Sequence, residues 1–127
     1  MLQEGSASVV KEVATTQRNN RHIEMMIFHD GRSVALFSDA IGIYRDRDAV
    51  LDPLGNGLIN IVALPKEYYF EESEAPWVQA HRAGFVQLYK GLSLLILPND
   101  IRLYRNSHDA LRNTDPIIQI PFDTEDK

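Results

Sequence analysis

One segment of this chain occurs twice, at a separation of sixty residues. Residues Met25 to Leu51 align without a gap onto Phe85 to Leu111. The identical pairs are Gly31/Gly91, Ser33/Ser93, Ile41/Ile101, Tyr44/Tyr104, Arg45/Arg105 and Leu51/Leu111. Repetition at a fixed period is a signal of architecture. It predicts a domain built from two copies of one unit, related by an approximate two-fold axis.

The repeated unit has the pattern of β-structure. Asp30-Gly31 lies between two apolar runs, as in a two-residue hairpin turn, and Lys90-Gly91 occupies the same place in the second copy. Apolar positions then alternate with a period of two along Ile41–Arg45 and Ile101–Arg105. The prediction is an all-β domain of about eight strands, arranged as two tandem four-stranded repeats in a sandwich or a barrel.

The chain divides into an arm and one domain. Its 127 residues suffice for a single hydrophobic core. Residues 1–21 are mostly polar and are expected to form an N-terminal arm, which cannot bury enough surface alone to offset its ordering entropy. Residues 22–127 form the single all-β domain. Within it we expect repeat one at 22–65, a connector at 66–83 with one helical turn over Trp77–Ala83, repeat two at 84–122 and an acidic tail at 123–127.

Composition excludes several classes of protein. Without cysteine there are no disulfides, thiolate zinc sites or cysteine nucleophiles. The net charge of −5 is opposite in sign to the basic stripe of a nucleic-acid binder. No signal-peptide pattern opens the chain, and its apolar stretches are too short to span a bilayer. We therefore expect a soluble protein of the cytoplasm or of a virion, with neither nucleic acid nor membrane as a partner.

The duplicated Tyr-Arg pair is the most specific candidate site. Tyr44-Arg45 and Tyr104-Arg105 end the third strand of each repeat. If the two-fold places both pairs at one cleft, two guanidinium forks and two phenol rings can clamp a small anionic ligand. In the competing interpretation, each arginine pairs with a nearby aspartate and each tyrosine fills an outer layer.

The connector carries a cluster of aromatic residues beside an acidic stretch. Tyr68, Tyr69, Phe70 and Trp77 could stack bases, but the neighbouring glutamates would repel phosphates. Tyrosine, tryptophan and arginine dominate interface energetics, and nine of the thirteen basic residues are arginine. The cluster is therefore interpreted as a protein-docking strip, or as core.

Motifs of catalysis and metal binding are weak in this sequence. His22 and Glu24 share one face of a strand, but His29, His81 and His108 follow no ligand spacing, and no nucleophile elbow or phosphate-binding loop occurs. We assign no catalytic residue, metal or cofactor. An enzyme using His22, Glu24 and a distant histidine is the least favoured hypothesis.

The leading functional hypothesis is a non-enzymatic subunit of a larger assembly, for example a virus or phage particle. Such a subunit would self-associate, or bind other protein subunits, through its arm and its edge strands. The alternative is a protein that binds or sequesters a small anionic ligand through the duplicated Tyr-Arg pair.

Overall fold

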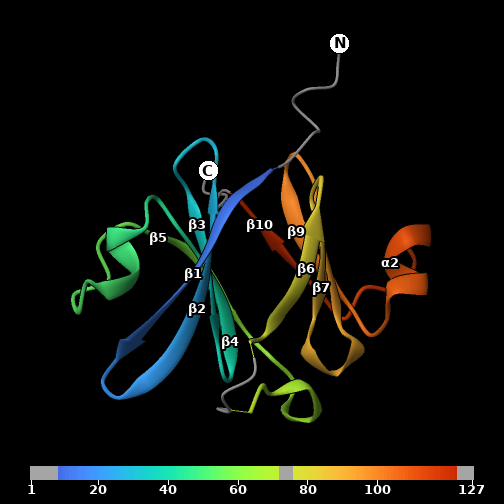
Figure 1. Cartoon of the computed structure of the whole chain (residues 1–127), viewed down its shortest axis with the longest axis horizontal. Coiled ribbons are helices and arrows are strands. Elements are labelled where there is room, and N and C mark those ends of the chain that lie inside the picture. Colours follow the sequence, from blue (N-terminus) through green and yellow to red (C-terminus); the bar gives the residue numbers. More distant parts are fainter. Residues whose placement is uncertain (1–8, 72–75, 123–127) are drawn as a thin grey trace.

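The chain folds into two antiparallel sheets of five strands each (Figure 1). The computed structural model describes residues 9–71 and 76–122. In both sheets each strand pairs with its neighbours in sequence, in the order β1-β2-β3-β4-β5 and β10-β9-β8-β7-β6. The first sheet comprises β1 (Val10–Arg18), β2 (Arg21–Phe28), β3 (Ser33–Phe37), β4 (Ala40–Tyr44) and β5 (Leu58–Ala63). The second comprises β6 (Val78–Arg82), β7 (Phe85–Leu88), β8 (Ser93–Ile96), β9 (Asp100–Tyr104) and β10 (Ile118–Pro121).

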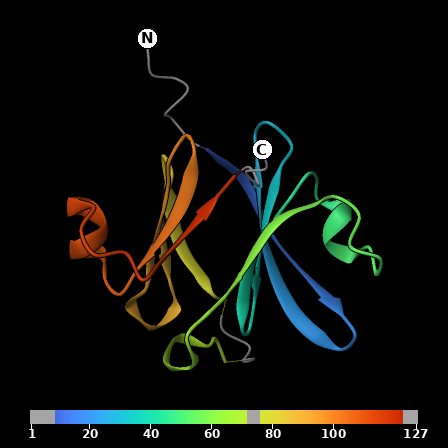
Figure 2. The ribbon, with the colours of Figure 1, turned by 180° about the vertical axis from the view of Figure 1, so that it is seen from behind.

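The two sheets pack face to face as a sandwich. Alternate residues of each strand point inward, so one apolar cluster contains Met26, Val34 and Ile43 from the first sheet and Val86 and Leu103 from the second. At one side of the sandwich β5 lies beside β10, as Figure 2 shows from behind. There the Asn60 side-chain amide donates to the Pro121 carbonyl at 3.1 Å.

The segments that match at a separation of sixty occupy the same places in the two sheets. Val34 pairs with Ile43 across β3 and β4, and Leu94 pairs with Leu103 across β8 and β9. The predicted all-β fold is therefore confirmed, as a sandwich of ten strands. An origin by duplication stays a prediction.

The two additional strands arise from hairpins that the sequence analysis did not predict. Residues 10–18, expected to form part of an arm, pair with β2 as strand β1. Asn19 and Asn20 both adopt positive φ, 55° and 65°, which is the geometry of a tight two-residue hairpin turn. The arm prediction is thus wrong for these residues, whereas residues 1–8 and the acidic tail 123–127 lie outside the described part of the chain.

The second unpredicted strand lies in the connector. Residues 78–82 form β6, so the helical turn expected over Trp77–Ala83 is wrong. Ala83 (φ 51°) and Gly84 (φ 88°) make the turn into β7. The rest of the described connector contains one 3-10 turn, η2 (Lys66–Tyr68).

The repeated glycine turns have loops of three residues rather than the predicted two. Phe28 N donates to Arg32 O at 2.8 Å, and Leu88 N donates to Leu92 O at 2.7 Å, so each loop spans the three residues between. Gly31 and Gly91 take positive φ, 100° and 81°. The second loop contains the 3-10 turn η3 (Tyr89–Gly91). A three-residue loop that ends in a glycine of positive φ is a common alternative to a two-residue turn.

Short helices cover the outer faces of the two sheets. The 3-10 helix η1 (Asp48–Leu51) packs Ala49 and Val50 onto the outer face of the first sheet. Helix α2 (Ser107–Arg112) packs on β8 and β9; Asn106 caps its start, and Asn113 ends it at φ 55°. Figure 1 shows η1 (green) and α2 (orange) on opposite sides of the sandwich. Among the described residues, no helix has the length and apolar character needed to cross a membrane.

Candidate functional site

The structure does not bring the duplicated Tyr-Arg pairs together. Tyr44 is buried on the outer face of the first sheet, in a cluster with Ile23, Ala35 and Val50. Tyr104 is fully buried within the second sheet, and its hydroxyl hydrogen-bonds to the Asn113 side-chain oxygen at the end of α2. The coverings η1 and α2 lie on opposite sides of the molecule in both views (Figures 1 and 2).

The two arginines also lie apart, each exposed just beyond the end of its strand. Arg105 Nε is 3.9 Å from an Asp109 carboxylate oxygen, which is a local ion pair. The expectation of a shared anion clamp built from Tyr44, Arg45, Tyr104 and Arg105 is therefore not met. The physical reason is strand alternation: Ile43 and Leu103 fill the space between the sheets, so the tyrosines point away from it.

The aromatic cluster of the connector is mainly core. Phe70 (3% exposed) and Trp77 (0%) stack with ring centroids 5.1 Å apart, inside the cluster that joins the two sheets. Tyr68 packs partly buried against the same cluster, and only Tyr69, at 38%, is substantially exposed. Buried rings cannot contact a partner, so the docking-strip interpretation is wrong for Phe70 and Trp77. The alternative, core, is what the structure shows for them.

Glu24 is the buried polar residue whose role the sequence did not reveal. Its carboxylate, on the inner face of β2, accepts hydrogen bonds from the backbone amides of Trp77 (2.6 Å) and Val78 (2.9 Å) at the start of β6. The His22 ring lies edge-on to Trp77, with centroids 4.7 Å apart, and its Nε2 is 3.6 Å from Glu24. Both carboxylate oxygens of Glu24 accept hydrogen bonds, and the residue is 1% exposed. Glu24 therefore links the two sheets and does not face a substrate.

The remaining histidines do not extend this pair into a metal site. His108 lies 3.8 Å from its neighbour Asp109 at α2, remote from His22. Across residues 9–71 and 76–122, no group of three or more histidine or acidic side chains is arranged to hold a metal ion.

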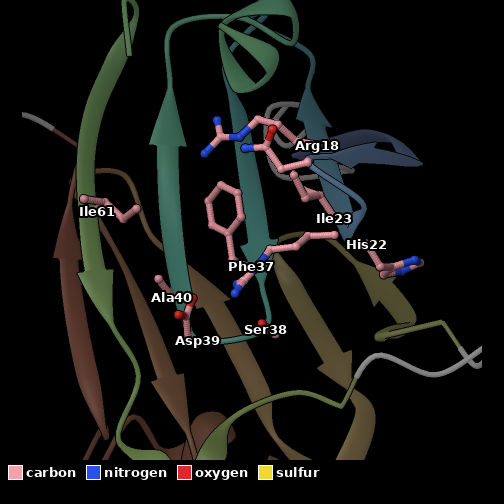
Figure 3. Close-up of a pocket in the computed structure, with 10 residues that line it drawn as sticks. Arg18, His22, Ile23, Phe37, Ser38, Asp39, Ala40 and Ile61 are labelled. Carbon is pink, nitrogen blue, oxygen red and sulfur yellow. The ribbon is translucent and has the colours of Figure 1, made fainter. Parts of the chain in front are cut away.

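A pocket of about 300 Å³ opens beside the turn of the β1–β2 hairpin. Figure 3 shows Phe37 at its centre, Arg18 extending over the ring, and Ile61 and Asp39 on the walls. His22 contributes from the rim, with its ring directed away from Phe37. We call this site the hairpin pocket; its lining is Arg18, Asn19, Arg21, His22, Ile23, Phe37, Ser38, Asp39, Ala40 and Ile61.

One side of the hairpin pocket is strongly basic. Arg18 and Arg21 are directly opposite each other in the β1–β2 register. The Arg18 guanidinium lies 5.4 Å from the Phe37 ring centroid and donates to Val50 O at 2.7 Å. Within the described part of the chain, neither arginine forms an ion pair with a carboxylate. The pocket thus contains two arginines that form no close ion pair with a described carboxylate, and one acidic residue, Asp39, in the same lining.

Tyr44 supports the floor of the hairpin pocket from below. Its ring meets Phe37 edge-on at 6.5 Å between centroids, and burial raises the pKa of its hydroxyl while the Arg18 charge opposes that rise. Gly42 makes room for this packing, since a Cβ at Gly42 would lie 2.9 Å from Tyr44 Cε1. Tyr44, which the sequence predicted as part of the anion clamp, is therefore a supporting residue beneath the hairpin pocket.

Beside this pocket, strand β1 presents a free edge. His29 N donates to Val9 O, and Phe28 N donates to Arg32 O. The backbone N–H and C=O groups of odd-numbered residues in β2 therefore point toward β1, and those of even-numbered residues point toward β3. The β1 partners of the odd residues, from Glu12 to Arg18 in steps of two, therefore direct their backbone groups toward β2. Val13, Thr15 and Gln17 direct theirs outward, where the described residues supply no further strand.

Comparison with protein-family models, with curated proteins and with solved structures finds no match to this chain.

Proposed function

We propose that this chain is a non-enzymatic protein-interaction subunit that self-associates through the free edge of strand β1. The observation that carries the proposal is the row of outward N–H and C=O groups at Val13, Thr15 and Gln17. An unpaired edge of this kind is a template for another strand, and adding one satisfies several backbone groups at once. The proposal keeps the edge-strand mechanism expected from the sequence and replaces the arm by β1.

The other edges of the sandwich are each protected, which singles out β1. On β5 the Ile61 amide donates to the Asn60 side-chain oxygen at 2.9 Å, and Asn60 also reaches Pro121. Strand β10 has four residues and includes that proline, which cannot donate. Strand β6 has five residues and a bulge between Val78 and Ala80. By contrast, β1 has nine residues, contains no proline and carries one lysine, at its bulged beginning.

The side chains along β1 suit pairing with a second copy. Thr15 and Gln17 are exposed, uncharged and compatible with strand structure, and Thr16 is half-buried. A two-fold axis through Thr15 would align Val13 with Gln17 of the second copy and the two Thr15 residues with each other. All of these positions direct their backbone groups outward, so the register is self-complementary.

The test is the mass of the protein in solution, measured by light scattering across a dilution series. We expect an oligomer for the full chain and a monomer for Thr15→Pro, because proline removes an outward donor without disturbing the β1–β2 ladder. Thr15→Val, which keeps the N–H group, is the matched control and should remain oligomeric. Deleting residues 1–21 is unsuitable, since it would remove β1 itself.

Circular dichroism and Trp77 emission establish that each variant is folded before its mass is interpreted. A full-length chain that is monomeric at every concentration would disprove self-association. A folded Thr15→Pro variant that stays oligomeric would show that the contact lies elsewhere.

A further inference from the structure

The hairpin pocket is lined by two arginines, Arg18 and Arg21, whose backbones are directly opposite each other in the β1–β2 register. Cross-strand pairs of like charge destabilise a sheet when nothing neutralises them. Arg18 and Arg21 form no ion pair with a described carboxylate, although Asp39 lines the same pocket and the chain as a whole has a net charge of −5. An anion bound between the two guanidiniums would remove this repulsion.

We propose that the hairpin pocket binds a small organic molecule through a carboxylate or phosphate group held by Arg18 and Arg21. This site shares strand β1 with the free edge: in the register argued above, Glu12 of a second copy would lie opposite Arg18, so binding is measured on samples whose mass is known. It uses the chemistry of an arginine clamp, as expected from the sequence for the Tyr-Arg pairs, but with different arginines on one hairpin.

Arg18 is already held in position to receive an anion. One Nη1 donor is bonded to Val50 O, and the guanidinium lies over the Phe37 ring, so its orientation is fixed from two directions. A guanidinium has five donors in a rigid fork, which leaves several for a ligand. Holding the group before binding lowers the entropy lost when a ligand arrives. Arg21, which is exposed, provides the second fork.

The walls restrict the rest of the ligand. Phe37, Ile23 and Ile61 provide apolar surface, and Ile61 is 45% exposed. Asp39 on the opposite wall disfavours a second anionic group and can accept a hydrogen bond from a ligand donor. A volume of about 300 Å³ is at the small end for ligand sites. The fitting ligand is therefore a small ring or short chain with one oxyanion at one end.

The overall charge of the protein makes specific binding distinguishable from general attraction. With a net charge of −5, the chain repels anions at long range, so a bound oxyanion requires the local arginine pair. An aromatic oxyanion should also bind more tightly than a bare one, because its ring can pack on Phe37.

The experiment is calorimetric titration of the full chain with benzoate, phenyl phosphate, inorganic phosphate and, as an uncharged control, benzamide. We expect at least one aromatic oxyanion to bind more tightly than inorganic phosphate, and benzamide not to bind. Benzoate and phenyl phosphate distinguish a carboxylate from a phosphate source. Arg21→Gln should weaken binding by about tenfold, the effect of losing one charge-assisted contact.

Arg21 is the residue to change, because Arg18 also bonds Val50 and its loss could disturb the fold. Arg45→Gln is the matched control: Arg45 is exposed on the same sheet, lies outside the pocket and should leave the affinity unchanged. Equal affinity of Arg21→Gln and the parent chain, or no binding of any oxyanion, would overturn the proposal. Light scattering on the same samples keeps this result separate from self-association.

Discussion

The carboxylate of Glu24 joins two layers that share no strand. By accepting from two consecutive amides at the start of β6, it acts as a short continuation of hydrogen bonding from one sheet to the other. If the side chain at position 24 had only one acceptor oxygen, at least one of the two buried N–H groups would have no partner. Such a loss costs more free energy than an average hydrogen bond contributes.

We expect Glu24→Gln to lower the free energy of unfolding by about 2–3 kcal/mol, because the amide group offers one acceptor oxygen where the carboxylate offers two. Urea denaturation measures this difference. Glu12→Gln is the control: Glu12 is exposed and forms only a 3.6 Å pair with Arg47, so its loss should cost less than about 1 kcal/mol. Equal losses for the two variants would contradict a linking role for Glu24.

Single residues show where reasoning from sequence stops. Alternation correctly assigned Tyr44 and Ile43 to opposite faces of a strand, since the period of two is local. Alternation alone does not predict that Tyr44 and Tyr104 lie on the outer faces of the two sheets, because that depends on which faces of the sheets pack together. Phe70 and Trp77 were ambiguous for the same reason: a local aromatic cluster is identical in sequence whether a second sheet covers it or not.

Among the elements, the β1–β2 hairpin is the one that most changes the functional interpretation. Its turn, Asn19-Asn20, is a recognisable signal, because asparagine tolerates positive φ better than other non-glycine residues. The signal was hidden by the polar composition of β1, whose exposed edge needs few apolar side chains. Strand β6 was missed similarly, since its turn begins with Ala83, a residue that rarely adopts φ of 51°.

Substitutions at Asn20 test this turn. With φ at 65°, Asn20→Val should lower the free energy of unfolding by about 1–2 kcal/mol, because a β-branched residue is strained in the left-handed region, whereas Asn20→Gly should cause no loss. Thermal denaturation reports the change. Asn56→Val, at an exposed loop position without positive φ, provides the comparison. If valine is tolerated equally at both sites, the turn geometry is incorrect.

At the scale of the whole molecule, the two sheets share one hydrophobic core between them. Residues from both sheets form the same cluster, and its aromatic centre, Trp77, is the only tryptophan of the chain. Neither sheet can lose its partner without exposing an apolar face, so the sandwich should unfold as one unit.

We expect tryptophan emission and far-ultraviolet circular dichroism to give superimposable urea transitions. Emission reports burial of Trp77 at the junction of the sheets, while circular dichroism reports strands in both. A red shift of emission that precedes the loss of strand signal would reveal separate unfolding of the two layers, contrary to the single-core architecture.

The order of strands also has a consequence for synthesis. Because no strand crosses between the sheets, β1–β5 are complete at Ala63, whereas β10 ends at Pro121. At typical elongation rates of roughly 5–20 residues per second, the ribosome needs several seconds to make the difference. Through that interval the nascent first sheet carries an uncovered face containing Met26, Phe28 and Val34. During synthesis the apolar face of the first sheet is therefore exposed for several seconds, and in this interval we expect molecular chaperones to bind it most readily.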